Sequence, residues 1–214
     1  MKWTALAAAA VLVCAGHAAR ADDAAASFTS LFNDVCLAKF GHLSAVEDWA
    51  EQRNLPRLRN PQAVAIFAGK PNRDGKMLSF AGGGVPGSGK AWLVHDQTGR
   101  FVLATRLDPE SCVTWALKAE PAAVEAAYAK MVTAMSPPGA TVKVVEDRTA
   151  DIPDGSVHIR VTRIWAGAPS NSLALALATV SRPGGPFQAM LETQRVFDPA
   201  DVINPMVPLE PPSN

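Results

Sequence analysis

Residues 157–196 decide the fold class of this chain, and they read VHIRVTRIWAGAPSNSLALALATVSRPGGPFQAMLETQRV. Three runs in this stretch are typical of β-strands, because each is rich in β-branched and aliphatic side chains. They cover residues 157–165, 172–181 and 187–196. The segments between them, 167–171 and 182–186, are made of turn-forming residues. Strands that follow one another through such short turns pair antiparallel, so this half of the chain predicts an antiparallel sheet.

The alternation of side chains within two of these runs indicates where each strand lies in the sheet. Leucines alternate with alanines over residues 173–178, so both faces of this strand are apolar and we expect it to be central. Over residues 157–162, aliphatic side chains alternate with polar ones, which predicts one face turned to water and His158 pointing outward. The alternation slips at Ile164, which indicates a β-bulge near Thr162.

The residues that precede this stretch predict helices first and strands later. Apolar side chains at helical spacing predict an amphipathic helix over residues 24–40. A capping-box pattern at residues 44–47 opens a second helix, and Pro121 opens a third, which ends at residues 136–139. Further strands are expected at 63–68, 77–81, 92–96, 100–106, 111–118 and 142–147, the third and fourth of them joined as a hairpin. The fold class is therefore α+β: an antiparallel sheet (meander) with two N-terminal helices and one mid-chain helix.

Composition excludes several classes of protein. The chain has 214 residues, with Lys+Arg 20 against Asp+Glu 20 and a hydrophobic share of 48%. This hydrophobic share is too high for a disordered chain, and the charge balance leaves no positive excess to neutralise nucleic-acid phosphates. After residue 21 no apolar run approaches the ~20 residues of a membrane helix, so we expect no membrane span in the mature chain. One globular domain is predicted.

The first 21 residues have the pattern of a secretory signal peptide. Lys2 is followed by an apolar stretch from 3 to 15, and Ala19–Ala21 matches a small-x-small cleavage pattern. An N-terminal membrane anchor is the alternative, but the apolar stretch is short for it; lipidation at Cys14 is disfavoured because Val13 is not small. We therefore predict a signal peptide (1–21), a single α+β domain (22–197) and a proline-rich disordered tail (198–214). The expected location is the periplasm, with secretion or association with the envelope as alternatives.

Two cysteines remain after such a cleavage, Cys36 and Cys112. In an oxidising compartment two cysteines most simply form one disulfide. Cys36 lies on the apolar face of the first predicted helix and Cys112 in a predicted strand. The bond would therefore join the first helix to the sheet.

A glycine-rich loop carries the sharpest match to a binding motif. Residues 84–90 read GVPGSGK and fit the phosphate-loop pattern G-x-x-x-x-G-K, so the candidate ligand residues are Gly84, Gly87, Ser88, Gly89 and Lys90. Two features differ from those of a true phosphate loop. Ala91 lacks the hydroxyl group that would bind magnesium, and the residues after it predict a strand instead of the helix that would hold the phosphate. We therefore interpret the loop as a connection that remains available to a ligand, and we expect no cofactor and no metal site.

The opening of the mature chain resembles an uncharacterised group of exported proteobacterial proteins. Residues 31–36 read LFNDVC, and Phe32, Cys36 and Cys112 fit the F-x-x-x-C helix and the mid-chain cysteine of this group, over residues 28–117. The resemblance implies export and a disulfide but no reaction. No catalytic residues are predicted. The expected function is a non-enzymatic exported protein that binds an envelope protein or a small ligand; the alternative is a hydrolase of envelope material with its site near Gly82–Gly89.

Overall fold

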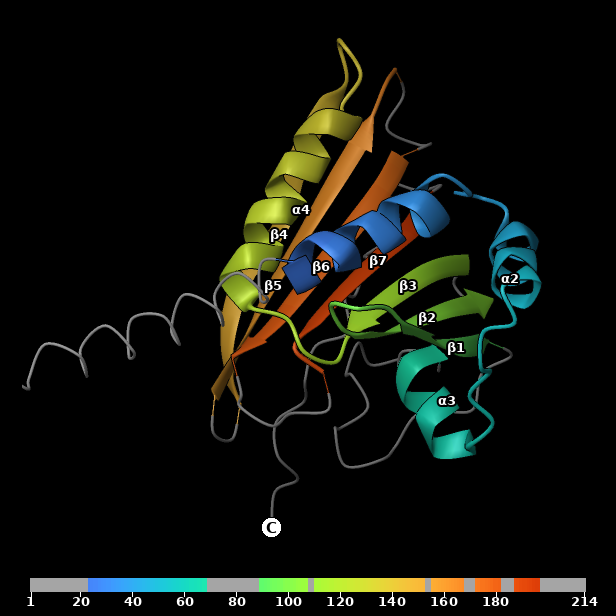
Figure 1. Ribbon diagram of the computed structural model, residues 1–214. Coiled ribbons are helices and arrows are strands. Elements are labelled where there is room, and N and C mark those ends of the chain that lie inside the picture. The colour runs from blue at the N-terminus through green and yellow to red at the C-terminus, as the bar shows by residue number, and fades with distance from the viewer. Residues whose placement is uncertain are drawn as a thin grey trace, which may run out of the picture.

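The computed structural model describes residues 23–68, 89–107, 110–152, 155–167, 172–181 and 187–196. Within these residues one antiparallel sheet of seven strands has the order β1-β2-β3-β7-β6-β5-β4 (Figure 1). The strands are β1 (Lys90–His95), β2 (Arg100–Leu107), β3 (Glu110–Ala116), β4 (Thr141–Ile152), β5 (Gly155–Trp165), β6 (Ser172–Ser181) and β7 (Ala189–Val196). The predicted α+β class with an antiparallel sheet is confirmed. The sheet consists of two meanders, β1–β3 and β4–β7, that join where β3 pairs with β7.

Helices cover both faces of this sheet. Residues 23–31 are α-helical and continue directly into the π-helical segment η1 (Phe32–Leu37); these residues are called the N-terminal helix below. The other helices are α2 (Leu43–Gln52), α3 (Pro61–Ala68) and α4 (Pro121–Met135). The N-terminal helix, α2 and α4 bury their apolar side chains against one face of the sheet, which we call the helix face. Helix α3 packs against the opposite face, over β1, β2 and β3.

Aromatic side chains fill the core on both faces. On the helix face, Phe28 of the N-terminal helix stacks on Phe101 of β2, with ring centroids 6.0 Å apart. On the opposite face, Trp115 meets Phe67 and Phe187 edge-on, at 5.5 Å and 4.6 Å. All of β6 between Ser172 and Val180 is buried or half-buried, which confirms that this strand, apolar on both faces, is central.

Helix α4 is fixed at its start and along its buried side. The carboxylate of Glu120 accepts a hydrogen bond from the amide of Ala123 at 2.7 Å, and Pro121 occupies the first turn, as expected for a helix start. The buried hydroxyl of Tyr128 donates to the carbonyl of Leu175 at 3.0 Å and lies 2.9 Å from the hydroxyl of Thr162. This helix is therefore tied to β5 and β6. Burial raises the pKa of Tyr128 to about 12.

Two predictions near the N-terminus are wrong. Residues 63–68 form helix α3 and not a strand, because Asn60 caps the helix by accepting hydrogen bonds from the amides of Gln62 and Ala63 at 2.9 and 3.3 Å. The capping box at residues 44–47 does not form either, since α2 begins at Leu43 and its first turn has no side-chain cap. Glu47 turns instead toward the sheet.

The later elements follow the predictions closely, with one displaced feature. The hairpin β1–β2, helix α4 and strands β3, β5, β6 and β7 lie where expected, and β4 extends beyond the predicted residues 142–147. The irregularity predicted near Thr162 lies in the neighbouring strand, because the register shifts between Val144 and Glu146 and the extra residue is Val145. No helix in the described part of the chain is long and apolar enough to cross a membrane. The predicted signal peptide, the strand at 77–81 and the tail lie outside the described residues.

Candidate functional site

The glycine-rich loop is described only at its last two candidate residues. Gly84, Gly87 and Ser88 lie outside the described residues, whereas Gly89 and Lys90 lead into β1. Gly89 is packed closely, since a Cβ there would lie 2.4 Å from the carbonyl oxygen of Thr105 and 2.5 Å from that of Ala68. A strand follows the loop, as predicted, so these residues do not begin a phosphate-binding helix.

The ammonium group of Lys90 interacts with helix α2. It forms an ion pair with the carboxylate of Glu47 in α2, whose second oxygen accepts a hydrogen bond from the hydroxyl of Thr105 at 3.3 Å. Both charged side chains are half-buried between α2 and the sheet. Lys90 thus anchors α2 in this structure, and a ligand role for the loop stays a prediction.

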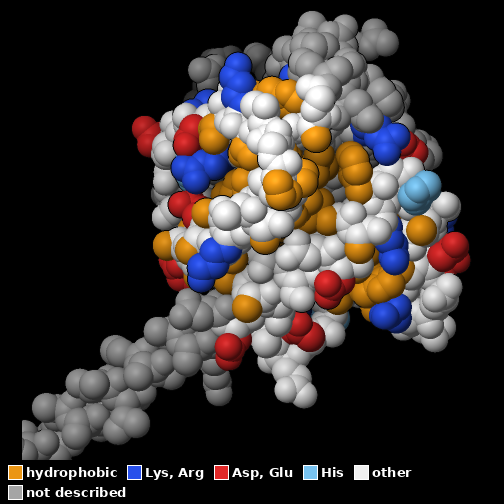
Figure 2. All heavy atoms as spheres, turned by 90° about the horizontal axis from the view of Figure 1, so that it is seen from above, with side chains coloured by type: hydrophobic (Ala, Val, Ile, Leu, Met, Phe, Trp, Pro, Cys, Tyr) orange, Lys and Arg blue, Asp and Glu red, His pale blue; other side chains and the backbone are white. Residues whose placement is uncertain are grey.

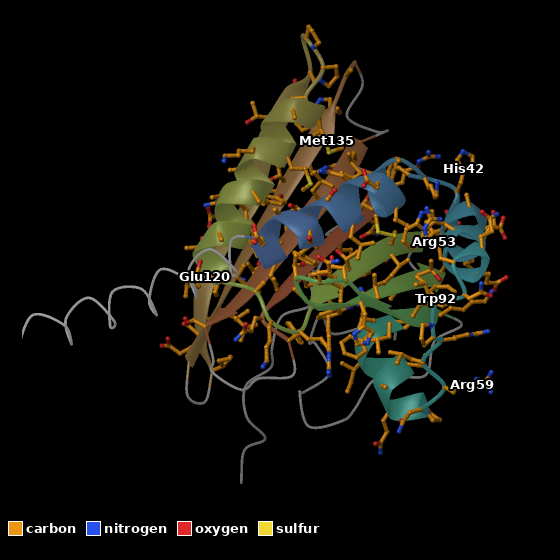
Figure 3. The ribbon with its side chains drawn as sticks, in the orientation of Figure 1. His42, Arg53, Arg59, Trp92, Glu120 and Met135 are labelled. Carbon is orange, nitrogen blue, oxygen red and sulfur yellow. A yellow bond between two sulfur atoms is a disulfide. The ribbon has the colours of Figure 1, made fainter. Side chains whose placement is uncertain are left out.

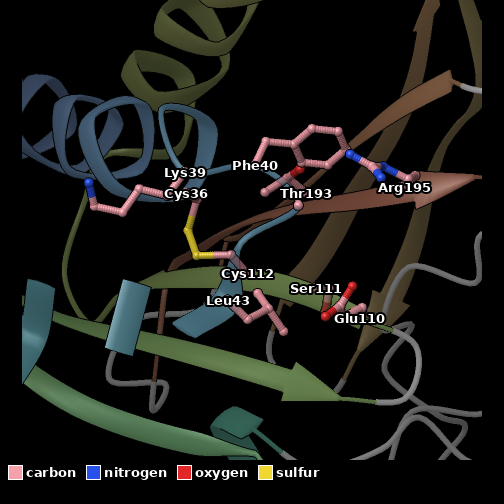
Figure 4. A pocket seen from close by; sticks show the side chains of 10 residues that line it. Cys36, Lys39, Phe40, Leu43, Glu110, Ser111, Cys112, Thr193 and Arg195 are labelled. Carbon is pink, nitrogen blue, oxygen red and sulfur yellow. A yellow bond between two sulfur atoms is a disulfide. The ribbon is translucent and has the colours of Figure 1, made fainter. Parts of the chain in front are cut away.

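The predicted disulfide between Cys36 and Cys112 is present. It joins η1 to β3 with an S–S distance of 2.00 Å and a Cα–Cα distance of 5.3 Å (Figure 4). A cavity of about 20 Å³ lies beside it, which is room for about one water molecule and too little for an organic ligand. Since both sulfurs are bonded to each other, neither cysteine is a thiol nucleophile in this oxidised state.

The strand pattern predicts that His158 points outward into water. In the structure its side chain instead lies between two carboxylates, beside α4. Its Nδ1 is 2.8 Å from Oε1 of Glu125 in α4, and its Nε2 is 2.7 Å from Oδ1 of Asp147 in β4. Arg160 donates to the second oxygen of Asp147 through Nε and a terminal nitrogen, at 3.0 and 2.8 Å. Thr179 of β6 donates to Glu125 at 2.7 Å. We call these five residues the histidine clamp.

Hydrogen bonds within the clamp favour the charged forms of His158, Asp147 and Glu125. Burial by itself disfavours the imidazolium, but hydrogen bonds to Asp147 and Glu125 outweigh it and raise the pKa of His158. The hydrogen bond from His158 is the main cause that lowers the pKa of Asp147. Burial by itself would raise the pKa of Glu125, but hydrogen bonds from Thr179 and His158 outweigh it and lower this pKa. An imidazolium with both nitrogens occupied is a poor general base, so the clamp serves to hold α4 against β4, β5 and β6.

The opposite side of α4 borders a groove of about 570 Å³ between α4 and the N-terminal helix. We call it the interhelical groove. Alanines line much of both walls, and hydroxyl, amide and ammonium groups complete them. The lining residues are Ala25, Ala26, Thr29, Ser30, Asn33, Ala123, Ala126, Ala127 and Lys130. Because alanine side chains are too short to meet across the gap, the two helices leave the space between them open.

The groove changes in character along its length. Figure 1 shows that the two helices start close together and diverge toward their C-terminal ends. Ala25 and Ala123 stand in the first turns, whereas Asn33 and Lys130 lie about two turns further along each helix. The narrow end is thus apolar, and the wide end carries a carboxamide and a positive charge. The hydroxyl of Thr29 donates to the carbonyl of Ala25 at 2.9 Å, so this wall residue is internally satisfied.

A buried ion pair crosses the opposite face of the sheet. Arg106 of β2 donates to Glu192 of β7 at 2.9 Å, with 3% and 8% of the two side chains exposed. Arg163 of β5 is also buried and donates to the hydroxyl of Ser172 at 2.8 Å. No sequence motif marks these residues.

The ionisable side chains around α2 and β1 do not converge on one site. Arg53 stacks over the ring of Trp49 at 4.3 Å, while Arg59 lies well away from it beside α3 (Figure 3). His42 and His95 are exposed at the start of α2 and the end of β1. Within the described residues no group of three or more His, Cys, Asp or Glu side chains is arranged to hold a metal ion.

Comparison with known proteins identifies no relative. No family model matches the chain, no curated protein matches its sequence, and no solved structure matches its fold. The geometry above therefore carries the functional argument alone.

Proposed function

We propose that the chain is an exported, non-enzymatic binding protein of the cell envelope, and that it binds a small amphiphilic ligand in the interhelical groove. The observation that carries this proposal is the groove itself. Its volume of about 570 Å³ falls within the range of about 300–1,000 Å³ that ligand sites occupy. The N-terminal sequence pattern and the disulfide support export, because disulfides persist in oxidising compartments.

The lining residues favour a ligand with a hydrocarbon chain and an anionic head. Methyl groups of Ala25, Ala123 and Ala127 offer an apolar wall at the narrow end, where a chain loses contact with water. Lys130 and Asn33 stand at the wide end and offer a positive charge and hydrogen-bond donors to a carboxylate. Single-chain fatty acids have this chemistry.

The histidine clamp supports the same site. It fixes the sheet-facing side of α4 through Glu125, while Ala123, Ala126 and Lys130 stand on the side that borders the groove. A wall held by charged hydrogen bonds keeps its distance from the N-terminal helix, whose own position is secured by the disulfide at Cys36. A site whose walls are fixed before binding loses less conformational entropy when the ligand enters.

Calorimetric titration with dodecanoate tests this proposal. Ala126→Trp should abolish binding, because the indole fills the groove; Ala129→Trp is the matched control, since Ala129 is exposed on α4 and does not line the groove. Lys130→Glu should weaken the binding of dodecanoate and leave that of uncharged 1-decanol nearly unchanged. Equal binding of dodecanoate by both tryptophan variants, or none by the native protein, would overturn the proposal.

A further inference from the structure

The two outer edges of the sheet, β1 and β4, differ in whether another segment of the described chain covers them. Along β1, residues 56–58 lie beside the strand, with hydrogen bonds from Leu58 to Ala91 and from Leu93 to Pro56, both at 2.8 Å. In the part of the chain that the structure describes, β4 pairs only with β5, so the outer edge of its twelve residues has no partner strand. A long open edge offers unpaired amides and carbonyls to another strand.

The same edge strand exposes large apolar side chains. Val142, Val144 and Val145 are 43%, 51% and 43% exposed, and they are the large hydrophobic side chains that stand out as exposed in the described residues. They follow directly on the end of α4, at the upper end of the molecule in Figure 1. Figure 2 shows the molecule from above, with hydrophobic side chains in the middle of this view and charged side chains around them. An exposed apolar edge of this kind marks an interaction surface.

The register of β4 assigns its side chains to the two faces. Val144 pairs with Thr162 and lies on the helix face, where Thr162 contacts Tyr128 of α4. Lys143 and Glu146 both lie on the opposite face, because the bulge at Val145 shifts the alternation by one residue. The strand therefore carries valine on the helix face. On the opposite face it carries Lys143, Glu146 and Arg148, of which Glu146 and Arg148 form an ion pair with each other.

We propose that β4 pairs antiparallel with β4 of a second copy of this chain, with Val144 opposite Val144 of that copy. A two-fold axis then passes beside Val144. Because Val145 is bulged out of the alternation in both copies, Lys143 of each copy lies opposite Glu146 of the other. The charges thus complement each other twice, and the valines cover one another on the helix face. An isologous contact of this kind needs only one self-complementary edge. It would join the two seven-stranded sheets into one.

Neighbouring registers are disfavoured by like charges. If the two-fold axis passes beside Lys143, the two copies of Lys143 lie opposite each other. If it passes beside Glu146, the two copies of Glu146 lie opposite each other. Like charges directly opposite each other across an antiparallel pair are destabilising. Of these three registers, the charge pattern of β4 favours the one with Val144 at the centre, and this preference can be tested by substitution.

Charge reversal on one strand at a time provides that test. The mass of the native protein in solution, measured by light scattering over a concentration series, should rise to that of a dimer. Lys143→Glu and Glu146→Lys should each raise the dissociation constant about tenfold or more, since like charges then oppose each other. An equimolar mixture of the two variants should dimerise again, because the introduced carboxylate and ammonium groups face one another. Circular dichroism confirms that each variant is folded.

A cross-linking experiment fixes the register independently. Mild oxidation of Val144→Cys should give a covalent dimer in high yield, while Thr149→Cys, on the same strand and also exposed, should not. A native protein that stays monomeric at every concentration, or a mixture that fails to dimerise, would overturn the inference. Neither result bears on the interhelical groove, whose lining residues all lie outside β4.

Discussion

Removal of the disulfide should destabilise the chain strongly, and the size of the effect follows from the loop that it closes. Cys36 and Cys112 are separated by 76 positions and are 0% and 3% exposed. Closing a loop of this length lowers the entropy of the unfolded chain enough to stabilise the fold by about 4.5 kcal/mol at 25 °C. Typical domains have a total stability of about 5–15 kcal/mol. We therefore expect the bond to supply a large part of the stability of this fold.

The Cys36→Ala/Cys112→Ala variant measures this contribution by urea unfolding. Alanine is chosen because it adds no buried hydroxyl group. The free energy of unfolding should fall by about 4–5 kcal/mol, which corresponds to a decrease in Tm of about 9–18 °C for a chain of this size. Native protein unfolded in the presence of a reductant is the control, since it loses the bond but keeps both sulfurs. A loss below about 1 kcal/mol in both experiments would show that the disulfide does not stabilise the fold through the entropy of the unfolded chain.

Three further substitutions test the packing of charge and backbone. Arg106→Met should cost about 3–5 kcal/mol because it leaves Glu192 buried without this cation, and the double variant with Glu192→Met should recover most of the loss in a thermal melt. His158→Gln should reduce the stability most below pH 6.5. Because the pKa of His158 is raised in the folded protein, the contribution of His158 to stability is complete below pH 6.5 and is lost as the pH rises through its folded-state pKa. A difference in Tm between variant and native protein that grows toward pH 9 would contradict the proposed role of the clamp. Gly89→Ala should destabilise the protein by about 1–3 kcal/mol in urea unfolding, since the added methyl group meets two backbone carbonyls; an unchanged midpoint would contradict that packing.

Strands and helices with a clear period and clear ends could be predicted from the sequence. Pro121 and the turn after Met135 delimit α4, and the leucine–alanine alternation of 173–178 identifies the central strand. The run at 63–68 misled because six apolar residues suit a strand or a buried helix equally well. The signal that distinguishes them is Asn60 followed by Pro61, which together start a helix.

Features that depend on distant parts of the chain could not be predicted. Glu47 has the spacing of a capping box, but Lys90 and Thr105, more than forty residues away, attract its carboxylate to the sheet. His158 has the spacing of a water-facing residue, but Glu125 of α4 provides a partner that only the packed structure brings near. A β-strand pattern does not reveal what covers its polar face.

The candidate site shows the same limit. The disulfide was predictable, since two cysteines in a chain that is expected to be exported most simply pair with each other. The interhelical groove was not, because alanines in the N-terminal helix and in α4 form a wall only when the two helices lie side by side. Alanine-rich stretches at 24–26 and 122–127 were the visible signal, and they suit ordinary close packing equally well.

Mass spectrometry of the protein purified from the envelope fraction of expressing cells tests export and ligand binding together. We expect a denatured mass that corresponds to a chain starting at Asp22 and is two hydrogens lighter than the reduced chain. In the native spectrum we expect each chain to carry one amphiphile, which the Ala126→Trp variant should lack and the Ala129→Trp variant should retain. An uncleaved N-terminus with free thiols would contradict export, and a native protein that never carries a ligand, even after incubation with dodecanoate, would contradict the binding function.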